Sequence, residues 1–263
     1  MNENLFFAWI IGVFMICLTS PIGSLIVWKR MSFLGDSLSH ASILGISLSY
    51  MINIDYFYIN FFLIFIFLLL ILLIEKYSYI KIDATINILT NISLSLGSIF
   101  LNCISKNKKI DIPHYFFGDF SHIFIYDVFK IFLISCTILI VLKIFWENFL
   151  LITISSELAQ IQGVNIFFMR FLLMFIISFV VCLAMKFFGV LLMTSLLIIP
   201  ISISQRFSSS PENSVIISFI ISLFAFTFGL FISFYFDFLI SPVIVLFLSI
   251  FFLLSLFLKS SKN

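Results

Sequence analysis

Long apolar segments, separated by short polar connections, run through almost the whole chain. A helix needs about 20 mostly apolar residues to cross a bilayer core of about 30 Å. Segments of about that length predict nine membrane-spanning helices, at residues 5–27, 37–54, 56–74, 84–104, 128–146, 166–185, 189–204, 214–235 and 238–258. Pro200 and Pro242 can break a helix into a half-span, so eight full spans remain the alternative to nine.

Composition places the chain among membrane proteins. Of its 263 residues, 63% are hydrophobic and 10% are charged, and the mean hydropathy is +1.28. Since soluble domains are about 25% charged, we expect an all-α polytopic membrane protein. No internal repeat or low-complexity linker divides the sequence, so we expect one transmembrane domain over residues 1–263. The net charge of +2, without a basic cluster among aromatic residues, gives no reason to expect a nucleic-acid partner.

The basic residues predict the orientation, because Lys and Arg are enriched in cytoplasmic connections. With the N-terminus outside, the cytoplasmic connections and their flanks hold Lys29, Arg30, Lys76, Lys81, Lys143, Arg170, Arg206, Lys259 and Lys262. The outer side then holds fewer basic residues, namely Lys106, Lys108, Lys109, Lys130 and Lys186. The first residues lack the basic region of a cleavable signal peptide, so we expect the first apolar segment to be retained.

Two polar connections between the predicted spans carry charged residues or histidines. The outer connection, residues 105–127, contains His114, Asp119 and His122, for which a solvated surface is favoured over a role in contacts. The short connection before residue 84 carries Glu75, Lys76, Lys81 and Asp83, which are interpreted as solvated. The four cysteines are scattered without a CxxC motif, and no Ser-His-Asp or Cys-His set is visible. We therefore expect neither a disulfide framework, nor a structural zinc site, nor an enzyme.

The cytoplasmic connection predicts a short helix at residues 155–164. Ser155 or Ser156 can be its N-cap, and Glu157 lies in the first turn, where its charge suits the helix dipole. Gly163 can adopt the left-handed conformation that ends a helix.

This short helix has one apolar face. Leu158 and Ile161 share that face, with Ala159 as a small neighbour. Such a helix can lie at the headgroup boundary or insert into a groove on a partner, and the sequence favours neither. The chain has no GxxxxGK[ST] phosphate loop, so if ATP drives its function, another subunit must bind the nucleotide.

The stretch RMSFLGDSLSHASILG, residues 30–45, carries the candidate metal ligands. Asp36 and His40 are four residues apart and therefore share one helical face. Carboxylate and imidazole are the groups from which many metal sites are built. The alternative is structural, with Asp36 in the first helical turn and His40 as a hydrogen-bond donor between helices.

Two features favour the metal site. Asp36, His40 and Ser47 form a polar stripe at 100° per residue. Small residues on the adjoining arc permit close helix approach; they are Gly35, Ser39, Ser42, Gly45 and Ser49. Two ligands are too few for a tight site, but two copies of the chain would supply four, which suits transient coordination of zinc or manganese.

Several stretches together resemble the permease subunit of a bacterial high-affinity zinc-uptake ABC transporter, in a family that imports zinc, manganese or iron. They keep their order and spread over nearly the whole length. They are RMSFLGDSLSHASILG (30–45), YFFGDF (115–120), ITISSELAQIQGV (152–164), AMKFFGVLLMTSLLIIPISISQRF (184–207) and FYFDFLISP (234–242).

The resemblance implies a multi-pass permease in the bacterial cytoplasmic membrane, with a fold similar to the vitamin-B12 and siderophore type of importer. It implies a homodimer, or a pair of permease chains, bound to two cytoplasmic ATP-binding subunits. A periplasmic or lipid-anchored metal-binding protein would deliver Zn²⁺, which is the transported substrate rather than a permanently bound cofactor. The chain itself would not be an enzyme.

The resemblance also implies residue roles. Asp36 and His40 match a D-x-x-x-H pair in the translocation pathway, and Phe117, Gly118 and Asp119 match an outer-loop FGD element. Residues 155–164 match the coupling helix, whose expected contacts with the ATPase are Ser155, Glu157, Leu158, Ala159, Ile161 and Gly163. Contacts of His114, Asp119 and His122 with a delivery protein remain a weaker expectation.

One residue departs from the family pattern. Ser241 stands where a Gly is expected before Pro242, which predicts a stiffer bend. The open alternatives are a manganese or iron permease of the same family and, less favoured, a secondary transporter that works without ATP.

Overall fold

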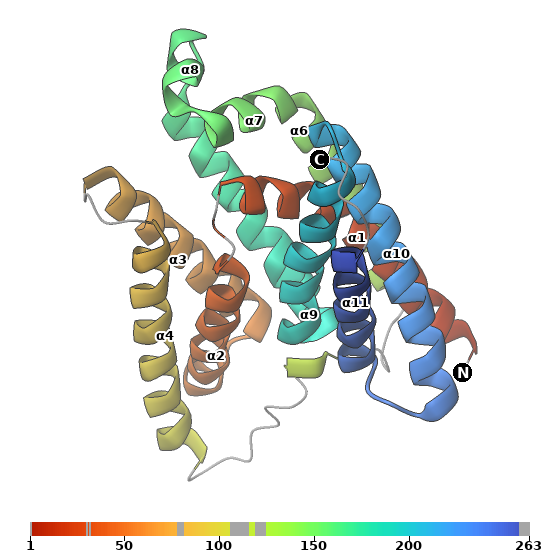
Figure 1. The fold of residues 1–263 in the computed structure, drawn as a ribbon. Coiled ribbons are helices and arrows are strands. Elements are labelled where there is room, and N and C mark those ends of the chain that lie inside the picture. The colour runs from red at the N-terminus through yellow and green to blue at the C-terminus, as the bar shows by residue number, and fades with distance from the viewer. Residues whose placement is uncertain are drawn as a thin grey trace.

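The computed structural model describes residues 2–29, 31, 33–77, 82–105, 116–118 and 125–257, without the side chains of residues 2–4, 76, 82 and 105. Within these ranges the regular secondary structure is entirely helical (Figure 1). The helices are α1 (Asn2–Trp28), α2 (Leu34–Ile52), α3 (Tyr56–Tyr77), α4 (Ile82–Ser105), α6 (Ile125–Ile144), α7 (Trp146–Ile154), α8 (Ser156–Ile161), α9 (Ile166–Phe207), α10 (Pro211–Phe236) and α11 (Ile240–Phe257).

Helix α9 is two antiparallel arms joined by a sharp reversal at Gly189, where φ is 70° and ψ is 175°. This region of backbone space is essentially restricted to glycine. Near the start of α9, Arg170 contacts Glu75 at the end of α3, and near its end Gln205 lines a pocket with Trp28 at the end of α1. Both ends of α9 therefore lie at the same end of the bundle, as two separate spans require.

The predicted number of spans agrees with the structure. In the described part of the chain, seven helices are long and apolar enough to cross a membrane. Helix α2 has 19 residues and is of similar length but more polar, and α9 crosses twice. Adding α2 and separating the arms of α9 brings the passes within the described residues to nine, so the chain is a multi-pass membrane protein.

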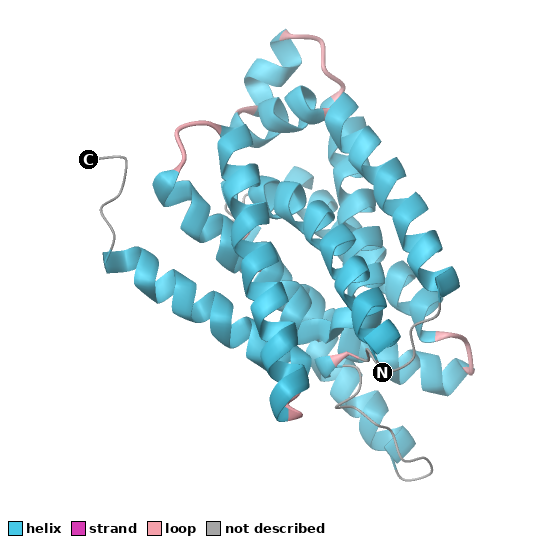
Figure 2. Ribbon diagram, turned by 90° about the vertical axis from the view of Figure 1, so that its right-hand side faces the viewer, coloured by secondary structure: helices cyan, strands magenta, loops and turns pink. Residues whose placement is uncertain are grey.

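The helices form two groups around α9. Helices α2, α3 and α4 pack together on one side of it, and α1, α6, α10 and α11 lie on the other (Figure 1). Helix α8 projects from one end of the bundle, called here the inner end, and the N-terminus lies toward the opposite, outer end. The loops that the structure describes lie at the ends of the helices (Figure 2). Placing α8 and the N-terminus at opposite ends agrees with the predicted orientation.

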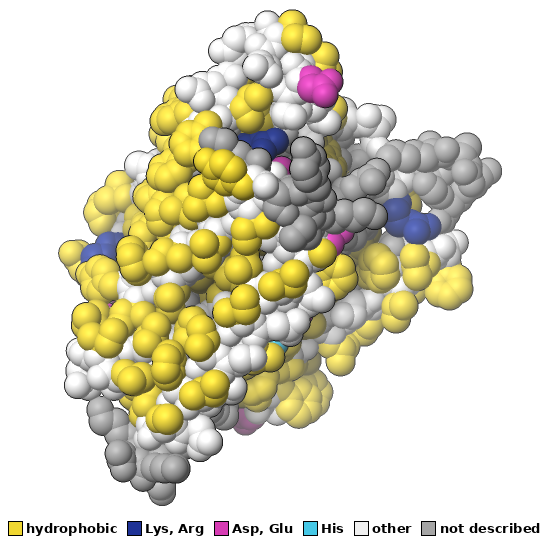
Figure 3. All heavy atoms as spheres, turned by 90° about the vertical axis from the view of Figure 1, so that its left-hand side faces the viewer, with side chains coloured by type: hydrophobic (Ala, Val, Ile, Leu, Met, Phe, Trp, Pro, Cys, Tyr) yellow, Lys and Arg dark blue, Asp and Glu magenta, His cyan; other side chains and the backbone are white. Residues whose placement is uncertain are grey.

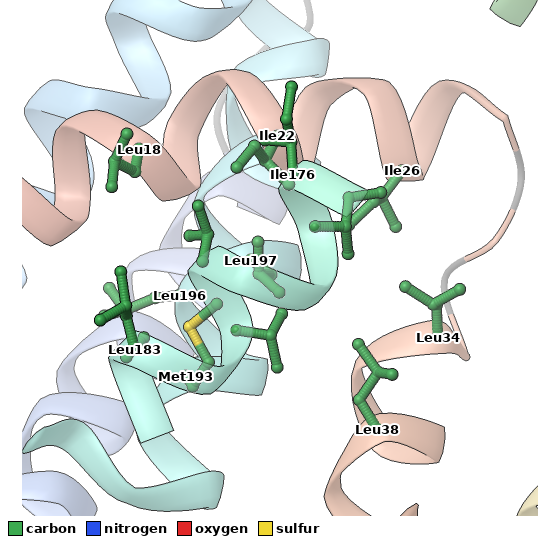
Figure 4. Packing of buried hydrophobic residues seen from close by; sticks show 14 of the residues in the cluster. Leu18, Ile22, Ile26, Leu34, Leu38, Ile176, Leu183, Met193, Leu196 and Leu197 are labelled. Carbon is green, nitrogen blue, oxygen red and sulfur yellow. The ribbon is translucent and has the colours of Figure 1, made fainter. Parts of the chain in front are cut away.

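The core lies where the second arm of α9 meets α1 and α2. Leu196 and Leu197 of α9 belong to the same buried cluster as Ile22 and Ile26 of α1 (Figure 4). The two helices approach each other closely at Gly23. A Cβ atom on Gly23 would lie only 2.3 Å from the Leu197 carbonyl oxygen. Burial against lipid-like surroundings adds little by itself, so such close packing is what holds membrane helices together.

Candidate metal pathway and coupling segment

The structure brings the two predicted metal ligands together in the first turns of α2. His40 Nε2 lies 3.7 Å from Asp36 Oδ2, and the side chains are 31% and 72% exposed, respectively. His40 Nδ1 is buried without a hydrogen-bond partner in the described part of the chain. Among these described residues no group of three or more His, Cys, Asp and Glu side chains forms a metal site. One chain therefore supplies a pair of ligands and not a full coordination shell.

Close packing of α2 was also predicted correctly. A Cβ atom on Gly35 would lie 3.1 Å from Ile198 Cδ1 of α9, and one on Gly45 would lie 2.7 Å from Asn60 Oδ1 of α3. The serine hydroxyls on the adjoining arc donate to carbonyl groups of their own helix, as Ser39 does to Asp36 and Ser42 does to Ser39. The serine hydroxyls at these positions are therefore paired within α2 itself and leave no buried donor without a partner.

Asp36 lines a pocket of about 380 Å³ between the start of α2 and the first turns of α4. The pocket is lined by Phe33, which directly precedes α2, and by residues of both helices, namely Asp36, Ser37, Asp83, Ala84, Asn87 and Thr90. Asp83 was predicted to be merely a solvated connecting residue, and the structure adds that it lines this pocket. The pocket places Asp36 at the level of the inner end of α4, which agrees with the position expected from the adjacent basic residues.

Helix α4 carries a polar face that the sequence reading missed. Its exposed polar side chains recur every three or four residues and form what we call the polar flank of α4; they are Asp83, Asn87, Asn91, Ser95, Ser98 and Asn102. A polar face toward lipid is unfavourable in a spanning helix. The face therefore requires water or another protein surface. The helical spacing of Asn and Ser in residues 83–102 could have revealed it.

The rest of the α4 surface is apolar. Ile88, Ile92 and Ile99 are exposed and lie on the arc of the helix next to the polar flank. The space-filling view of the side formed by α3 and α4 shows mainly hydrophobic side chains with few charges between them (Figure 3). Helix α4 thus has one side suited to lipid and another suited to a polar environment.

The predicted short helix is present as α8, and Ser155 is its N-cap, accepting a hydrogen bond from the Leu158 amide at 3.4 Å. Gly163 follows with φ 76°, as expected for a left-handed terminating residue. Ala159 is fully buried, whereas Leu158 and Ile161 are exposed, Ile161 at 81%. The apolar face of α8 therefore has no partner among the described residues.

The outer-loop prediction is only partly covered by the structure. His114, Asp119 and His122 lie outside the described residues. Phe117 and Gly118 are described, and Gly118 has φ 74° and packs against the reversal of α9. This part of the FGD element has a packing role.

The hydroxyl of Ser241 has a structural role that a glycine could not have at this position. Its hydroxyl lies 2.5 Å from the Phe117 carbonyl oxygen and 2.8 Å from the Phe188 carbonyl oxygen. It therefore ties the start of α11 to the FGD element and to the reversal of α9. These contacts support the prediction of a stiffer bend before Pro242, which stays a prediction.

Comparison with known proteins agrees with these features. Residues 1–259 match the family model described as the ABC 3 transport family. The chain is 40% identical over 255 residues to the high-affinity zinc uptake system membrane protein of Buchnera aphidicola subsp. Schizaphis graminum, covering 97% of this chain and 98% of that protein. It is 29% identical over 265 residues to the manganese import system permease protein of Streptococcus gordonii, covering 100% and 92%. The solved structure of PsaBC from Streptococcus pneumoniae in complex with Fab is similar with a TM-score of 0.81 at 28% identity, covering 96% of this chain and 90% of that chain.

Proposed function

Because this chain belongs to the ABC 3 transport family, we propose that it is the permease subunit of an importer that carries Zn²⁺ across the bacterial cytoplasmic membrane. ATP is hydrolysed by a separate cytoplasmic subunit, since this chain has no GxxxxGK[ST] phosphate loop. Zinc is favoured over manganese because the identity to the zinc uptake protein, 40%, exceeds the 29% to the manganese permease. Zn²⁺ is the cargo, and the proposal includes no permanently bound cofactor.

The observation that carries the proposal is the pair of exposed Asp36 and half-buried His40 beside the polar flank of α4. An aspartate carboxylate and a neutral imidazole suit zinc. Asp36 is 72% exposed, so its oxygens are free to accept an ion from the neighbouring pocket. We assign Asp36 and His40 as ligands of the ion in transit.

A homodimer follows from the same surface. One chain offers two ligands, and a second copy related by a two-fold axis would supply two more. The polar flank of α4 adjoins Asp36 of the ligand pair, because Asp36, Asp83 and Asn87 line one pocket. A second copy facing this flank would enclose a polar pathway between the chains and remove the exposed polar side chains from lipid.

Helix α8 is the proposed contact with the ATP-binding subunit. Exposed Leu158 and Ile161 are suited to insertion into a groove, while buried Ala159 fixes the helix to its own chain. Ser155, Glu157 and Gly163 shape the ends of this coupling segment. At the outer end, a periplasmic or lipid-anchored metal-binding protein would deliver the ion, with Asp119, His114 and His122 as the proposed contacts.

The substrate is tested by uptake into membrane vesicles that contain this chain and its partners. Zinc should enter only with ATP, and unlabelled zinc should compete better than manganese or iron, because imidazole favours zinc. If manganese competes with zinc uptake as well as unlabelled zinc does, the result would instead support the manganese permease function. Zinc entry without ATP would support a stand-alone carrier.

Ile161→Glu is expected to detach the ATP-binding subunit. The substitution places a charge on the exposed apolar face of α8 without disturbing packing, because Ile161 is 81% exposed. Loss of an interface anchor of about 2 kcal/mol corresponds to about 30-fold weaker association. The measurement is co-purification of the subunit from detergent extracts.

Gln160→Glu is the matched control, because Gln160 is also exposed but lies about 100° around the same helix from Ile161, off the face of Leu158 and Ile161. It adds the same charge and should leave association unchanged. Equal co-purification with Ile161→Glu and with the wild type would contradict the role of α8.

A further inference from the structure

Three charged side chains from distant parts of the chain meet at the inner end of the bundle. Lys29 directly follows α1, Glu75 lies near the end of α3, and Arg170 lies in the second turn of α9. Arg170 donates a hydrogen bond from a guanidinium nitrogen to Glu75 Oε1 at 3.2 Å, and Lys29 Nζ lies 3.6 Å from Glu75 Oε2. Their side chains are only 10%, 19% and 23% exposed for Lys29, Glu75 and Arg170. Glu75 was predicted to be solvated, and this prediction was wrong.

Such a cluster resists separation. Charges removed from water are stable only when they are paired, and loss of one partner leaves the others exposed to the full cost of burial. Burial lowers the pKa of Lys29, while the nearby Glu75 carboxylate opposes this shift and the Arg170 guanidinium adds to it. The three helix ends are therefore expected to move together.

Two backbone hydrogen bonds of Met31 join the end of α1, next to Lys29, to the start of the ligand helix. The Met31 amide donates to the Ile26 carbonyl at 3.1 Å, and the Leu34 amide donates to the Met31 carbonyl at 2.9 Å. Met31 and Leu34 are buried. A displacement of Lys29 would consequently reach the first turn of α2, which holds Asp36.

A second compact connection joins α8 to Arg170. The Val164 amide donates to the Ala159 carbonyl at 3.0 Å, and the Asn165 side chain caps α9 by accepting from the Phe168 amide at 3.1 Å. Arg170 follows within the same helix. A tilt of α8 is thus transmitted to Arg170 through hydrogen-bonded backbone.

Direct packing between the α8 region and Lys29 is looser. A pocket of about 580 Å³ lies between Lys29 and the end of α7, with Thr153 and Ile154 in its wall. The ion cluster therefore gives a more continuous route from α8 to α2 than the surface beside α7 does.

We propose that Lys29, Glu75 and Arg170 are positioning residues that carry the movement of α8 to Asp36 and His40. The inference rests on the proposed function, because it assigns the cluster the task of coupling ATP hydrolysis to access at the metal ligands. In this proposal Arg170 moves with α8, and its ion pair with Glu75 displaces the end of α3. The ion pair of Glu75 with Lys29 then displaces the start of α2.

The test is the number of zinc ions imported per ATP hydrolysed by the complete complex in lipid vesicles. Lys29→Met leaves the Glu75–Arg170 pair intact and removes only the connection to α2. It should preserve assembly and ATP hydrolysis but lower zinc imported per ATP by about tenfold, within the usual range of coupling between distant sites. Lys29→Arg keeps the charge and the reach and should restore the wild-type ratio.

Lys186→Met is the matched control, since Lys186 pairs with Asp127 at 3.9 Å and is remote from α8. Its ratio should equal that of the wild type. If Lys29→Met does not assemble, Lys29→Gln is measured instead, because it keeps a polar side chain at this place but removes the positive charge that pairs with Glu75. A wild-type ratio in the variant that assembles, or failure of both to assemble, would overturn the coupling role. Absence of ATP-driven zinc import by the wild type would instead overturn the proposed function.

Discussion

Asp36→Ala and His40→Ala are each expected to reduce ATP-driven zinc uptake to background while the ATP-binding subunit stays attached. In a symmetric homodimer, either substitution removes two of the four proposed ligands. Loss of a group that merely orients a ligand lowers metal affinity by about 10- to 100-fold, and loss of the ligand should exceed this. The measurement is zinc uptake into vesicles at matched abundance of the chain.

Asp36→Asn separates the charge from the shape, because the amide keeps the size of the carboxylate but binds zinc poorly. Asp55→Asn is its matched control: Asp55 is exposed at the start of α3, and its Oδ1 accepts from the Phe57 amide at 2.8 Å, a contact that asparagine retains. Asp36→Asn should abolish uptake, and Asp55→Asn should not. Wild-type uptake by both alanine variants would remove Asp36 and His40 from the pathway.

Much of the geometry of this candidate site was predictable because its pattern is local. Asp36 and His40 share a helical face by spacing alone, and the structure places their side-chain atoms 3.7 Å apart. The close approach of Gly35 and Gly45 to other helices also follows from residue size. For α8, the sequence offered Ser155 or Ser156 as the N-cap, and the hydrogen bond from Leu158 identifies Ser155.

Contacts between distant segments were not predictable. The spacing of Asn and Ser could have indicated the polar flank of α4, but nothing in the sequence shows that Asp83 and Asn87 of this flank share a pocket with Asp36 of α2. Glu75 has the polarity of a loop residue, and nothing near it in sequence identifies Lys29 and Arg170 as its partners. Long-range pairing of this kind depends on how helices pack, which hydrophobic patterns leave open.

Gly189→Ala is expected to be the most destabilising single substitution at the outer end. The backbone at Gly189, with φ 70° and ψ 175°, costs about 1–3 kcal/mol for a residue with a side chain. The added Cβ would also lie 2.4 Å from the Gly118 nitrogen and 2.5 Å from the Phe116 carbonyl oxygen. Both neighbours are backbone atoms, so relief requires the FGD element to move away from the α9 reversal. The expected result is severe loss of folded protein, measured as abundance in membranes and thermal unfolding in detergent.

Gly163→Ala separates the two causes of this loss. Gly163 also has a positive φ, 76°, but a Cβ there would meet nothing within 4 Å. It should cost only the left-handed conformation, about 1–2 kcal/mol. Ser241→Ala removes the hydroxyl that lies between the Phe117 and Phe188 carbonyl oxygens of the same junction, and losing its hydrogen bond should cost about 0.5–1.5 kcal/mol. Gly189→Ala should exceed both, because it combines backbone strain with backbone overlap at a point where three distant segments meet. Equal stability of the Gly189→Ala and Gly163→Ala variants would show that the junction yields easily and does not hold the reversal of α9 in place.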